Sequence, residues 1–179
     1  MTPGVLGPED YNSLADHLNR LGAETDCAGL RYFSPYTGAP RDAHDPEKRK
    51  QSLLNWACPV GEAGWQKVWG LRIDGGGPVV AHLELAGPGL PIKQHRAGVT
   101  LGVEAAFRRQ GCGGSLLREA IGFARGAGLA WLDLWVFAHN APALALYNKI
   151  GFAEAGRFED AFRLGSKSIE DVAMVLRLV

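Results

Sequence analysis

A glycine-rich segment stands directly before an amphipathic helix in this sequence, and this junction limits the folds open to the chain. Gly111, Gly113 and Gly114 lie within four residues. The apolar residues that follow at helical spacing are Leu116, Leu117, Ala120, Ile121 and Ala124. The pattern predicts a helix that begins just after the glycines, with backbone N–H groups that have no acceptor inside the helix. Such amides, with the positive end of the helix dipole, form an anion site, and residues without a Cβ let a phosphate approach closely.

The glycines alone are compatible with a P-loop, a dinucleotide-binding loop or a plain flexible turn. A P-loop carries a Lys before a Ser or Thr at the helix start, but here Gly114 precedes Ser115. The dinucleotide fingerprint G-x-G-x-x-G would need a glycine at Leu116, and it follows a parallel βαβ unit rather than hairpins. Both nucleotide-binding loops are therefore excluded, and the surrounding sequence has to decide between an anion site and a turn.

The rest of the chain predicts an α+β protein with one domain, residues 1–179, because no repeat or linker divides it. Helices are expected over Pro8–Gly22, Pro46–Ala57 and Ala141–Ile150. Strands are expected over Lys67–Ile73, Pro78–Ala86, Ala97–Phe107, Ala130–Phe137, and near Gly151–Ala155 and Val172–Leu178. Asp74 and the three glycines after it predict a hairpin turn. We expect Leu53, Leu54 and Trp56 to face the core, and the segment from Glu24 to Asp45 to be irregular.

Composition and charge exclude several classes of protein. Nineteen basic and nineteen acidic residues give zero formal charge, so the chain lacks the broad positive charge of a nucleic-acid or anionic-membrane binder. The N-terminus has no signal-peptide pattern, and no apolar run approaches the ~20 residues of a membrane helix. The three cysteines, Cys27, Cys58 and Cys112, fit neither a disulfide framework nor a zinc site. A cytoplasmic protein with reduced thiols and no metal is expected.

Two motifs carry a family resemblance. The segment Arg108-Arg109-Gln110-Gly111-Cys112-Gly113-Gly114 resembles the R-x-x-G-x-G loop of the GNAT superfamily of N-acetyltransferases, which binds the pyrophosphate of acetyl-coenzyme A. Further along, Asn140–Phe152 resembles that family's second motif, N-x-x-A-x-x-L-Y-x-x-x-G-F. The resemblance spans nearly the whole chain. It implies the GNAT fold: a mixed, mostly antiparallel sheet of six to seven strands, flanked by about four helices and splayed between the strand ending at Val103 and the strand Trp131–Phe137.

The resemblance also implies the residues that hold coenzyme A. They are Leu101, Gly102, Val103, Arg108, Arg109, Gln110, Gly111, Cys112, Gly113, Gly114, Ser115, Asn140 and Tyr147. The strand residues would bond the pantetheine through their backbone, with an N–H near Val103 polarising the thioester carbonyl. Arg108 and Arg109 would either add charge beside the pyrophosphate or be solvated loop residues. Cys112 would pack as a small apolar residue rather than act as a nucleophile.

Two residues of the second motif have further expected roles. Asn140 directly precedes a helix with Pro142 in its first turn, so it is also an N-cap candidate. Tyr147 would be the general acid that protonates the departing thiolate, since an ordinary Tyr is protonated at neutral pH.

The general base is not identified by the sequence. Relatives place a catalytic Glu near the position of Ala97 or at the position of Trp135, and neither is Glu here. The candidates that remain are Glu84, His82, Glu104 and His139, with ordered water as an alternative. His17 and His44 are expected to be exposed.

The resemblance implies an N-acetyltransferase that moves an acetyl group from acetyl-coenzyme A to a primary amine by direct attack in a ternary complex. A non-catalytic acyl-coenzyme A sensor and transfer of a different acyl group are alternatives; the latter depends on the gap near Val103, Val136 and Phe137. The acceptor, a small amine, an amino acid, a peptide N-terminus or a drug, would depend on residues 30–45, 88–95 and 158–168. Nucleic-acid and membrane partners are not expected, and a homodimer stays open.

Overall fold

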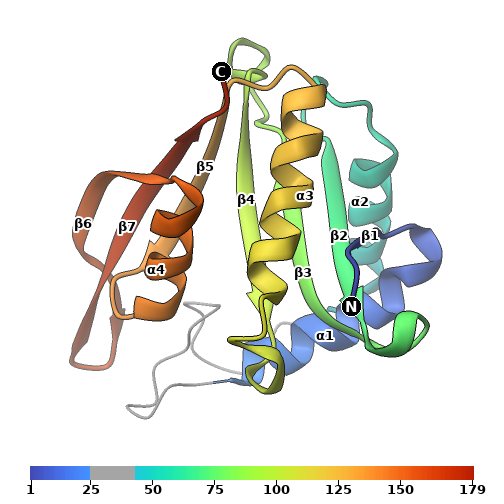
Figure 1. The fold of residues 1–179 in the computed structure, drawn as a ribbon, viewed down its shortest axis with the longest axis horizontal. Coiled ribbons are helices and arrows are strands. Elements are labelled where there is room, and N and C mark those ends of the chain that lie inside the picture. The colour runs from blue at the N-terminus through green and yellow to red at the C-terminus, as the bar shows by residue number, and fades with distance from the viewer. Residues whose placement is uncertain (25–42) are drawn as a thin grey trace.

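The computed structural model describes residues 1–24 and 43–179, which form one seven-stranded sheet with four α-helices packed on it (Figure 1). The strand order is β1-β2-β3-β4-β5-β7-β6. The strands are β1 Gly4–Val5, β2 Gln66–Arg72, β3 Val79–Ala86, β4 Arg96–Val103, β5 Trp131–Phe137, β6 Ala153–Leu164 and β7 Lys167–Arg177. The helices are α1 Tyr11–Ala23, α2 Pro46–Ala57, α3 Cys112–Gly126 and α4 Ala141–Ile150. The predicted mixed α+β architecture is confirmed.

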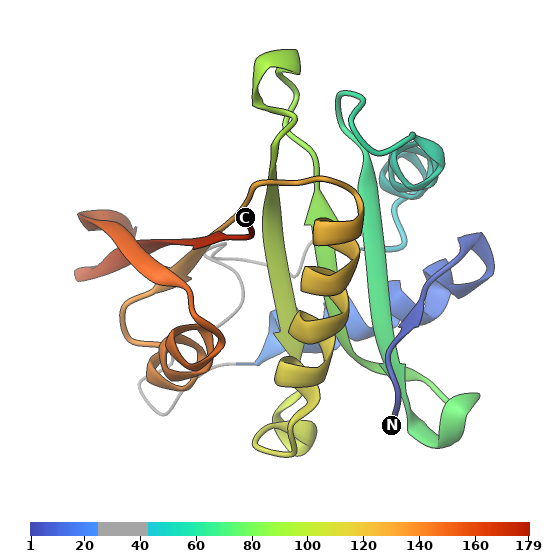
Figure 2. The same ribbon diagram turned by 45° about the horizontal axis from the view of Figure 1, so that its top comes forward.

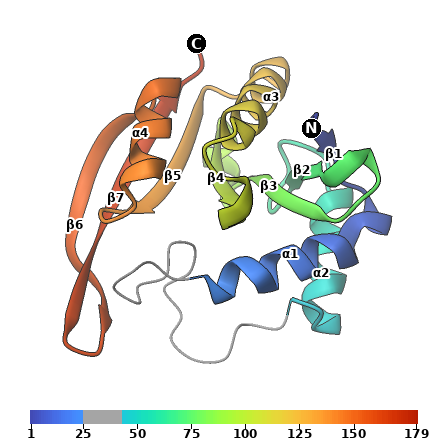
Figure 3. The same ribbon diagram turned by 60° about the horizontal axis from the view of Figure 1, so that its bottom comes forward.

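The helices cover the two faces of the sheet in pairs: α3 and α4 lie on one face, and α1 and α2 on the other (Figure 3). The apolar stripe predicted for α3, including Leu116 and Leu117, is fully buried in the main core against Leu83 and Leu85 of β3. A smaller core on the opposite face includes Leu14 of α1. None of the helices within residues 1–24 and 43–179 is long and apolar enough to cross a membrane.

The sheet opens between its two central strands. Strand β4 pairs in parallel with β5 at three positions only, Arg96 with Trp131, Ala97 with Leu132 and Gly98 with Asp133. Beyond them the two strands diverge, and α4 and α3 lie on either side of the opening (Figures 1 and 2). Arg96 holds the closed end, because its Nε donates to Asp133 Oδ2 at 2.8 Å. The splay predicted between β4 and β5 is confirmed.

The last two strands are much longer than the sequence predicted. Instead of short strands near Gly151–Ala155 and Val172–Leu178, β6 and β7 form an extended hairpin that turns at Gly165, with φ 61°. Most of β6 is exposed on both faces. Since neither face packs on a core, no apolar alternation marks it as a strand. The predicted strand Ala97–Phe107 is shorter than expected, because β4 ends at Val103 and Ala105–Phe107 form a 3-10 turn.

Two local expectations about helices were wrong. Helix α3 begins at Cys112, after the left-handed N-cap Gly111 at φ 83°, so Gly113 and Gly114 lie inside its first turn rather than before it. In α2 the range is confirmed but Leu54 is 58% exposed, since this helix lies over β2 near one end of the sheet and buries no residue completely. Residues 25–42, where an irregular segment was predicted and where Cys27 falls, lie outside the described residues.

Candidate active site

A cleft of about 510 Å³ fills the opening between β4 and β5. The loop before α3 lines one end, β4 and α4 line the sides, and residues of β5, β6 and β7 line the other end. The predicted coenzyme A residues that border the cleft are Leu101, Val103, Arg108, Arg109, Gly111, Cys112, Gly113, Gly114, Asn140 and Tyr147. Gly102, Gln110 and Ser115 do not border it, nor does the β3–β4 connection of residues 88–95. The structure thus gathers two distant motifs around one opening in the sheet.

The loop end of the cleft presents unpaired helix amides. The first helical bond of α3 runs from the Ser115 N–H to the Gly111 carbonyl, at 3.0 Å. The N–H groups of Cys112, Gly113 and Gly114 precede that bond, so they have no acceptor within the helix. With the helix dipole behind them, these amides favour an anion at this end of the cleft. The Cys112 side chain is buried in the main core, which agrees with its expected packing role.

The open edge of β4 directs alternate peptide groups into the cleft. Glu104 N–H donates to the Val80 carbonyl of β3 at 3.1 Å, and β3 and β4 pair in antiparallel register. Because peptide groups along a strand alternate between its two edges, Gly102 faces β3, whereas Leu101 and Val103 direct their N–H groups to the opposite, open edge. The amide donors that an extended acyl chain requires are therefore present beside the cleft.

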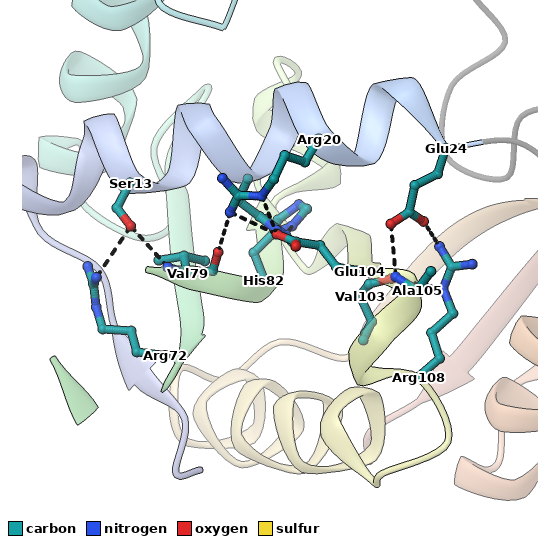
Figure 4. Close-up of polar contacts among 11 residues, drawn as sticks. Ser13, Arg20, Glu24, Arg72, Val79, His82, Val103, Glu104, Ala105 and Arg108 are labelled. Carbon is teal, nitrogen blue, oxygen red and sulfur yellow. Dashed lines mark hydrogen bonds and ion pairs between the residues drawn. The ribbon is translucent and has the colours of Figure 1, made fainter. Parts of the chain in front are cut away.

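Arg108 is tied to the end of β4. Its Nε donates to the Val103 carbonyl at 2.9 Å, and its Nη2 forms an ion pair with Glu24 at the C-terminal end of α1 (Figure 4). Glu24 also accepts from the Ala105 N–H at 2.8 Å. These contacts fix the strand end and the loop start to α1. Arg108 is thus held from two sides, which limits its reach toward the loop amides.

Helix α4 brings the second motif to the cleft wall. The Asn140 side chain accepts from the Ala143 N–H at 3.3 Å, so the predicted N-cap is confirmed. Tyr147 lies one to two turns further on, buried between the cleft and Phe152. Burial raises the pKa of Tyr147 to about 12. The phenol is therefore protonated throughout the neutral range.

The candidate bases lie around the cleft rather than in its lining. Glu84 on β3 accepts from Gln66 Nε2 at 3.4 Å, and burial raises its pKa. Burial also raises the pKa of Glu104, but hydrogen bonds from Arg20 and His17 outweigh it and lower the pKa overall. His139 stacks on Phe137, with ring centroids 5.4 Å apart. Within residues 1–24 and 43–179, no group of three or more His, Cys, Asp or Glu side chains could hold a metal ion.

The expectation that His17 is exposed was wrong, because it lies fully buried between α1 and the sheet. Its Nδ1 donates to Glu104 Oε1 at 2.6 Å. A carboxylate only accepts, so neutral His17 has its lone pair on Nε2, where His82 Nδ1 donates at 3.0 Å. Burial lowers the pKa of His17 despite the carboxylate, and it lowers the pKa of His82 to about 3. His44 is exposed as expected and pairs with Asp16.

The buried histidine pair predicts loss of stability in mild acid. His82 is neutral in the fold but binds a proton below a pH of about 6.5 when unfolded, so its contribution is complete above that pH and declines as the pH falls toward 3. We expect the free energy of unfolding in urea to fall between pH 6.5 and 5 with a slope approaching about 1.4 kcal/mol per pH unit for this group alone. His82→Gln should flatten the profile and His44→Gln should not; equal slopes in all three proteins would contradict the assignment.

The sequence analysis did not single out Asp171 on β7, which borders the far end of the cleft and is only 8% exposed. Its partner across the ladder is Phe137 of β5. The signal that could have identified Asp171 is a single acidic residue among the apolar residues of a strand. The predicted strand began at Val172, so Asp171 fell just outside it.

Comparison with known proteins gives the family. The sequence profile of the acetyltransferase (GNAT) family matches residues 31–152. Over 79 residues, 44% of this chain and 48% of the relative, the chain is 37% identical to a Bacillus subtilis protein provisionally named phosphinothricin acetyltransferase YwnH. Over 57 residues, 32% of this chain and 34% of the relative, it is 46% identical to the N-alpha-acetyltransferase RimI of Mycobacterium tuberculosis. The matched segments thus span less than half the length of either curated relative.

A solved structure extends the similarity of fold to the whole chain. It is yncA from Salmonella typhimurium, provisionally described as an acetyltransferase and solved with its cofactor acetyl-CoA. The two chains superpose with a TM-score of 0.79 and 15% sequence identity, over 100% of this chain and 94% of the other. At that identity the likeness shows the fold, and the profile match, which covers more than half of the sequence, shows the family. The chain belongs to the GNAT family of acetyltransferases.

Proposed function

We propose that the protein transfers an acetyl group from acetyl-coenzyme A to a primary amine by direct attack in a ternary complex. The observation that carries the proposal is the cleft itself, which joins free helix amides, an open strand edge and a protonated Tyr147 in one opening. Each of these groups matches one part of the acyl donor: the pyrophosphate, the pantetheine with its thioester, and the sulfur that leaves. The family membership of the chain supports the same reaction class.

The donor side of the proposed reaction follows from the loop and β4. A Cβ placed on Gly113 would come within 2.9 Å of Leu146 and 3.4 Å of Leu101. A residue without a side chain is therefore needed where α3 packs closely on the cleft wall. The amides from Arg109 to Gly114 would receive the pyrophosphate. The open-edge N–H of Leu101 would bond the pantetheine, and the N–H of Val103 would stabilise the thioester oxygen as it gains charge, an interaction worth a few kcal/mol.

The chemical step needs a neutral amine, an oxyanion donor and an acid. The amine nitrogen would attack the thioester carbonyl carbon, and the carbon–sulfur bond would break as the Tyr147 hydroxyl donates its proton to the sulfur. The pKa of Tyr147, at about 12, lies above the value of about 8.5 for an ordinary thiol, so the phenolate left after proton donation is the stronger base. The phenolate would regain a proton from the one that leaves the amine nitrogen. Glu84, Glu104 and His139 remain candidates for carrying that proton, together with water.

The cleft passes from one face of the sheet to the other, and this supports separate entry of donor and acceptor. Val136 faces the main core beneath α4. Its neighbours Trp135 and Phe137, on the opposite face because strand side chains alternate, line the cleft as well. We propose that coenzyme A occupies the α3–α4 side and that the amine enters from the face of Trp135 and Phe137.

A thiol-release assay tests the proposed function. Purified protein and acetyl-coenzyme A are mixed with a panel of primary amines that includes phosphinothricin, free amino acids, peptides with unblocked N-termini and arylalkylamines, and free coenzyme A is measured with a thiol reagent. We expect amine-dependent release at a rate well above the hydrolysis seen without amine. Tight binding of acetyl-coenzyme A with no release across the panel would instead favour a sensor.

A further inference from the structure

A buried carboxylate lies at the acceptor end of the cleft with an unused oxygen. Asp171 is 8% exposed, and within the described residues its Oδ1 has no hydrogen-bond partner. Burial raises the pKa of Asp171, and the bond from the Val172 N–H offsets this only in part. Leaving a buried carboxylate oxygen unpaired is unfavourable, so natural structures retain such a group mainly where a ligand or solvent completes it.

Aromatic residues are the partners of Asp171 on both neighbouring strands. Phe137, the ladder partner of Asp171, contacts Phe162 with ring centroids 5.6 Å apart. Phe158, the ladder partner of Asp171 on β6, forms an edge contact with Trp135 at 5.0 Å, and both rings are more than half exposed. Trp135 borders the cleft and Phe158 does not, so this exposed pair extends outward from the cleft wall. Exposed apolar groups beside a cleft are typical of a binding surface, and aromatic faces attract cations.

A bulge in β6 makes this arrangement possible. Phe158 pairs with Asp171 and Phe162 pairs with Ile169, so four steps along β6 match two steps along β7. The extra residues include Asp160, with φ 53°. Because the number of extra residues is even, Phe158 and Phe162 both remain on the face that Asp171 shares with Phe137. The hairpin thus places two aromatic rings on the face of Asp171, and Phe162 borders the cleft itself.

The charges that border the cleft are separated along its length. Among the described residues that line it, the charged ones are Arg108, Arg109 and Asp171. The two arginines belong to the loop end, where a pyrophosphate is expected, and Arg108 is already paired with Glu24. Asp171 stands at the opposite end, bordered by aromatic and aliphatic side chains. The donor end is therefore suited to an anion and the acceptor end to a cation.

We propose that Asp171 binds the ammonium group of the acceptor within the aromatic site formed by Trp135, Phe137, Phe158 and Phe162, and thereby selects amines with no carboxylate beside the nitrogen. The inference rests on the proposed function, since it specifies that reaction's acceptor as a primary amine that binds as its ammonium ion and carries an apolar or aromatic body. The ammonium group would lose one proton, to water or to one of the candidate bases, before its nitrogen attacks the thioester. A free amino acid would bring its own carboxylate against Asp171, where like charges in a buried site repel. An amidated amino acid or an arylalkylamine would not.

L-phenylalaninamide and L-phenylalanine test the proposal, because they differ only in the group beside the nitrogen. We expect the wild-type protein to prefer the amide in kcat/KM by at least tenfold. Asp171→Asn keeps the size of the side chain and removes its charge, so it should lower kcat/KM for the amide by about 10- to 100-fold, mainly through KM, and reduce the preference. The KM for acetyl-coenzyme A should stay unchanged.

Glu170→Gln is the matched control, because Glu170 is adjacent in sequence, points to the other face and is held by Arg157. It should leave the preference intact. Calorimetry measures the binding of both compounds in the presence of coenzyme A, so it tests the ammonium site independently of acetyl transfer. Acetyl transfer by wild type with equal use of both compounds, or with no effect of Asp171→Asn, would overturn the ammonium site and leave the proposed function standing. Asp171-dependent binding of the amide without any transfer would support the site and overturn the transferase.

Discussion

Replacement of Gly113 by leucine is expected to weaken acetyl-coenzyme A binding by at least about 100-fold. A Cβ at this position already comes within 2.9 Å of Leu146, and a full side chain would extend between α3 and the cleft wall beside Leu101 and Val103. Either α4 moves away or the leucine occupies the space of the ligand. Both outcomes separate the helix amides from the pyrophosphate, and losing one or two charge-assisted hydrogen bonds costs about 3 kcal/mol. Equilibrium titration with acetyl-coenzyme A measures the effect.

The control for this substitution is Gly122→Leu. Gly122 lies in the same helix, and a Cβ there meets no atom within 4 Å, so this variant keeps the helix and should bind acetyl-coenzyme A as wild type does. Overpacking at Gly113 also costs about 1 to 3 kcal/mol of stability, so thermal unfolding has to show that the variant is folded at the assay temperature. A folded Gly113→Leu protein with wild-type affinity would refute the phosphate loop.

The sequence predicted most of the sheet because its central strands are buried or half-buried and bounded by turns. Asp74 and the glycines after it separate two apolar runs, and the structure has an antiparallel β2–β3 hairpin there. The α3 stripe follows the helical period because one face meets the sheet. Where elements have little core contact, the sequence signal failed: most residues of β6 are exposed, and the length of this strand was underestimated.

The parts of the site that depend on local backbone geometry could be predicted from the sequence. The parts that depend on tertiary contacts could not. Free helix amides follow from glycines before an apolar stripe, and the N-cap role of Asn140 follows from local sequence. By contrast, His17 is buried, and its hydrogen-bond partner Glu104 lies 87 positions away in the sequence. The place of Asp171 in the cleft depends on the pairing of β7 with β5. The spacing of apolar residues along one segment does not indicate which distant residues that segment will contact.

The network around Glu104 links the acceptor face to the donor strand. Arg20 and His17 of α1 both bond Glu104, which directly follows β4. Glu24, at the C-terminal end of the same helix, forms an ion pair with Arg108 (Figure 4). Helix α1 is therefore fastened at two points to the strand end whose Val103 N–H is proposed to polarise the thioester. Preorganised donors of this kind need no reorientation during the reaction, which is where their catalytic advantage arises.

The substitution Tyr147→Phe removes the hydroxyl and is expected to slow the chemical step by about 100-fold or more. That factor is the lower end of the rate enhancement that a general acid typically contributes. Phenylalanine fills the same volume beside Phe152, so the cleft wall and the affinity for acetyl-coenzyme A should change little. Single-turnover kinetics with pre-bound acetyl-coenzyme A measures the chemical step free of product release.

Tyr11→Phe is the matched control for Tyr147→Phe, because the Tyr11 hydroxyl donates to the Ala43 carbonyl on α1's side of the fold, away from the cleft lining. It removes the same atom and should leave the single-turnover rate unchanged. If Tyr147→Phe instead weakened acetyl-coenzyme A binding and left the chemical rate intact, Tyr147 would be a binding residue and the sulfur would take its proton from another donor. A pKa of about 12 keeps the proton on the buried Tyr147 phenol at neutral pH. A selective fall in the chemical rate, with unchanged affinity and unfolding temperature, would therefore mean that this proton takes part in breaking the carbon–sulfur bond.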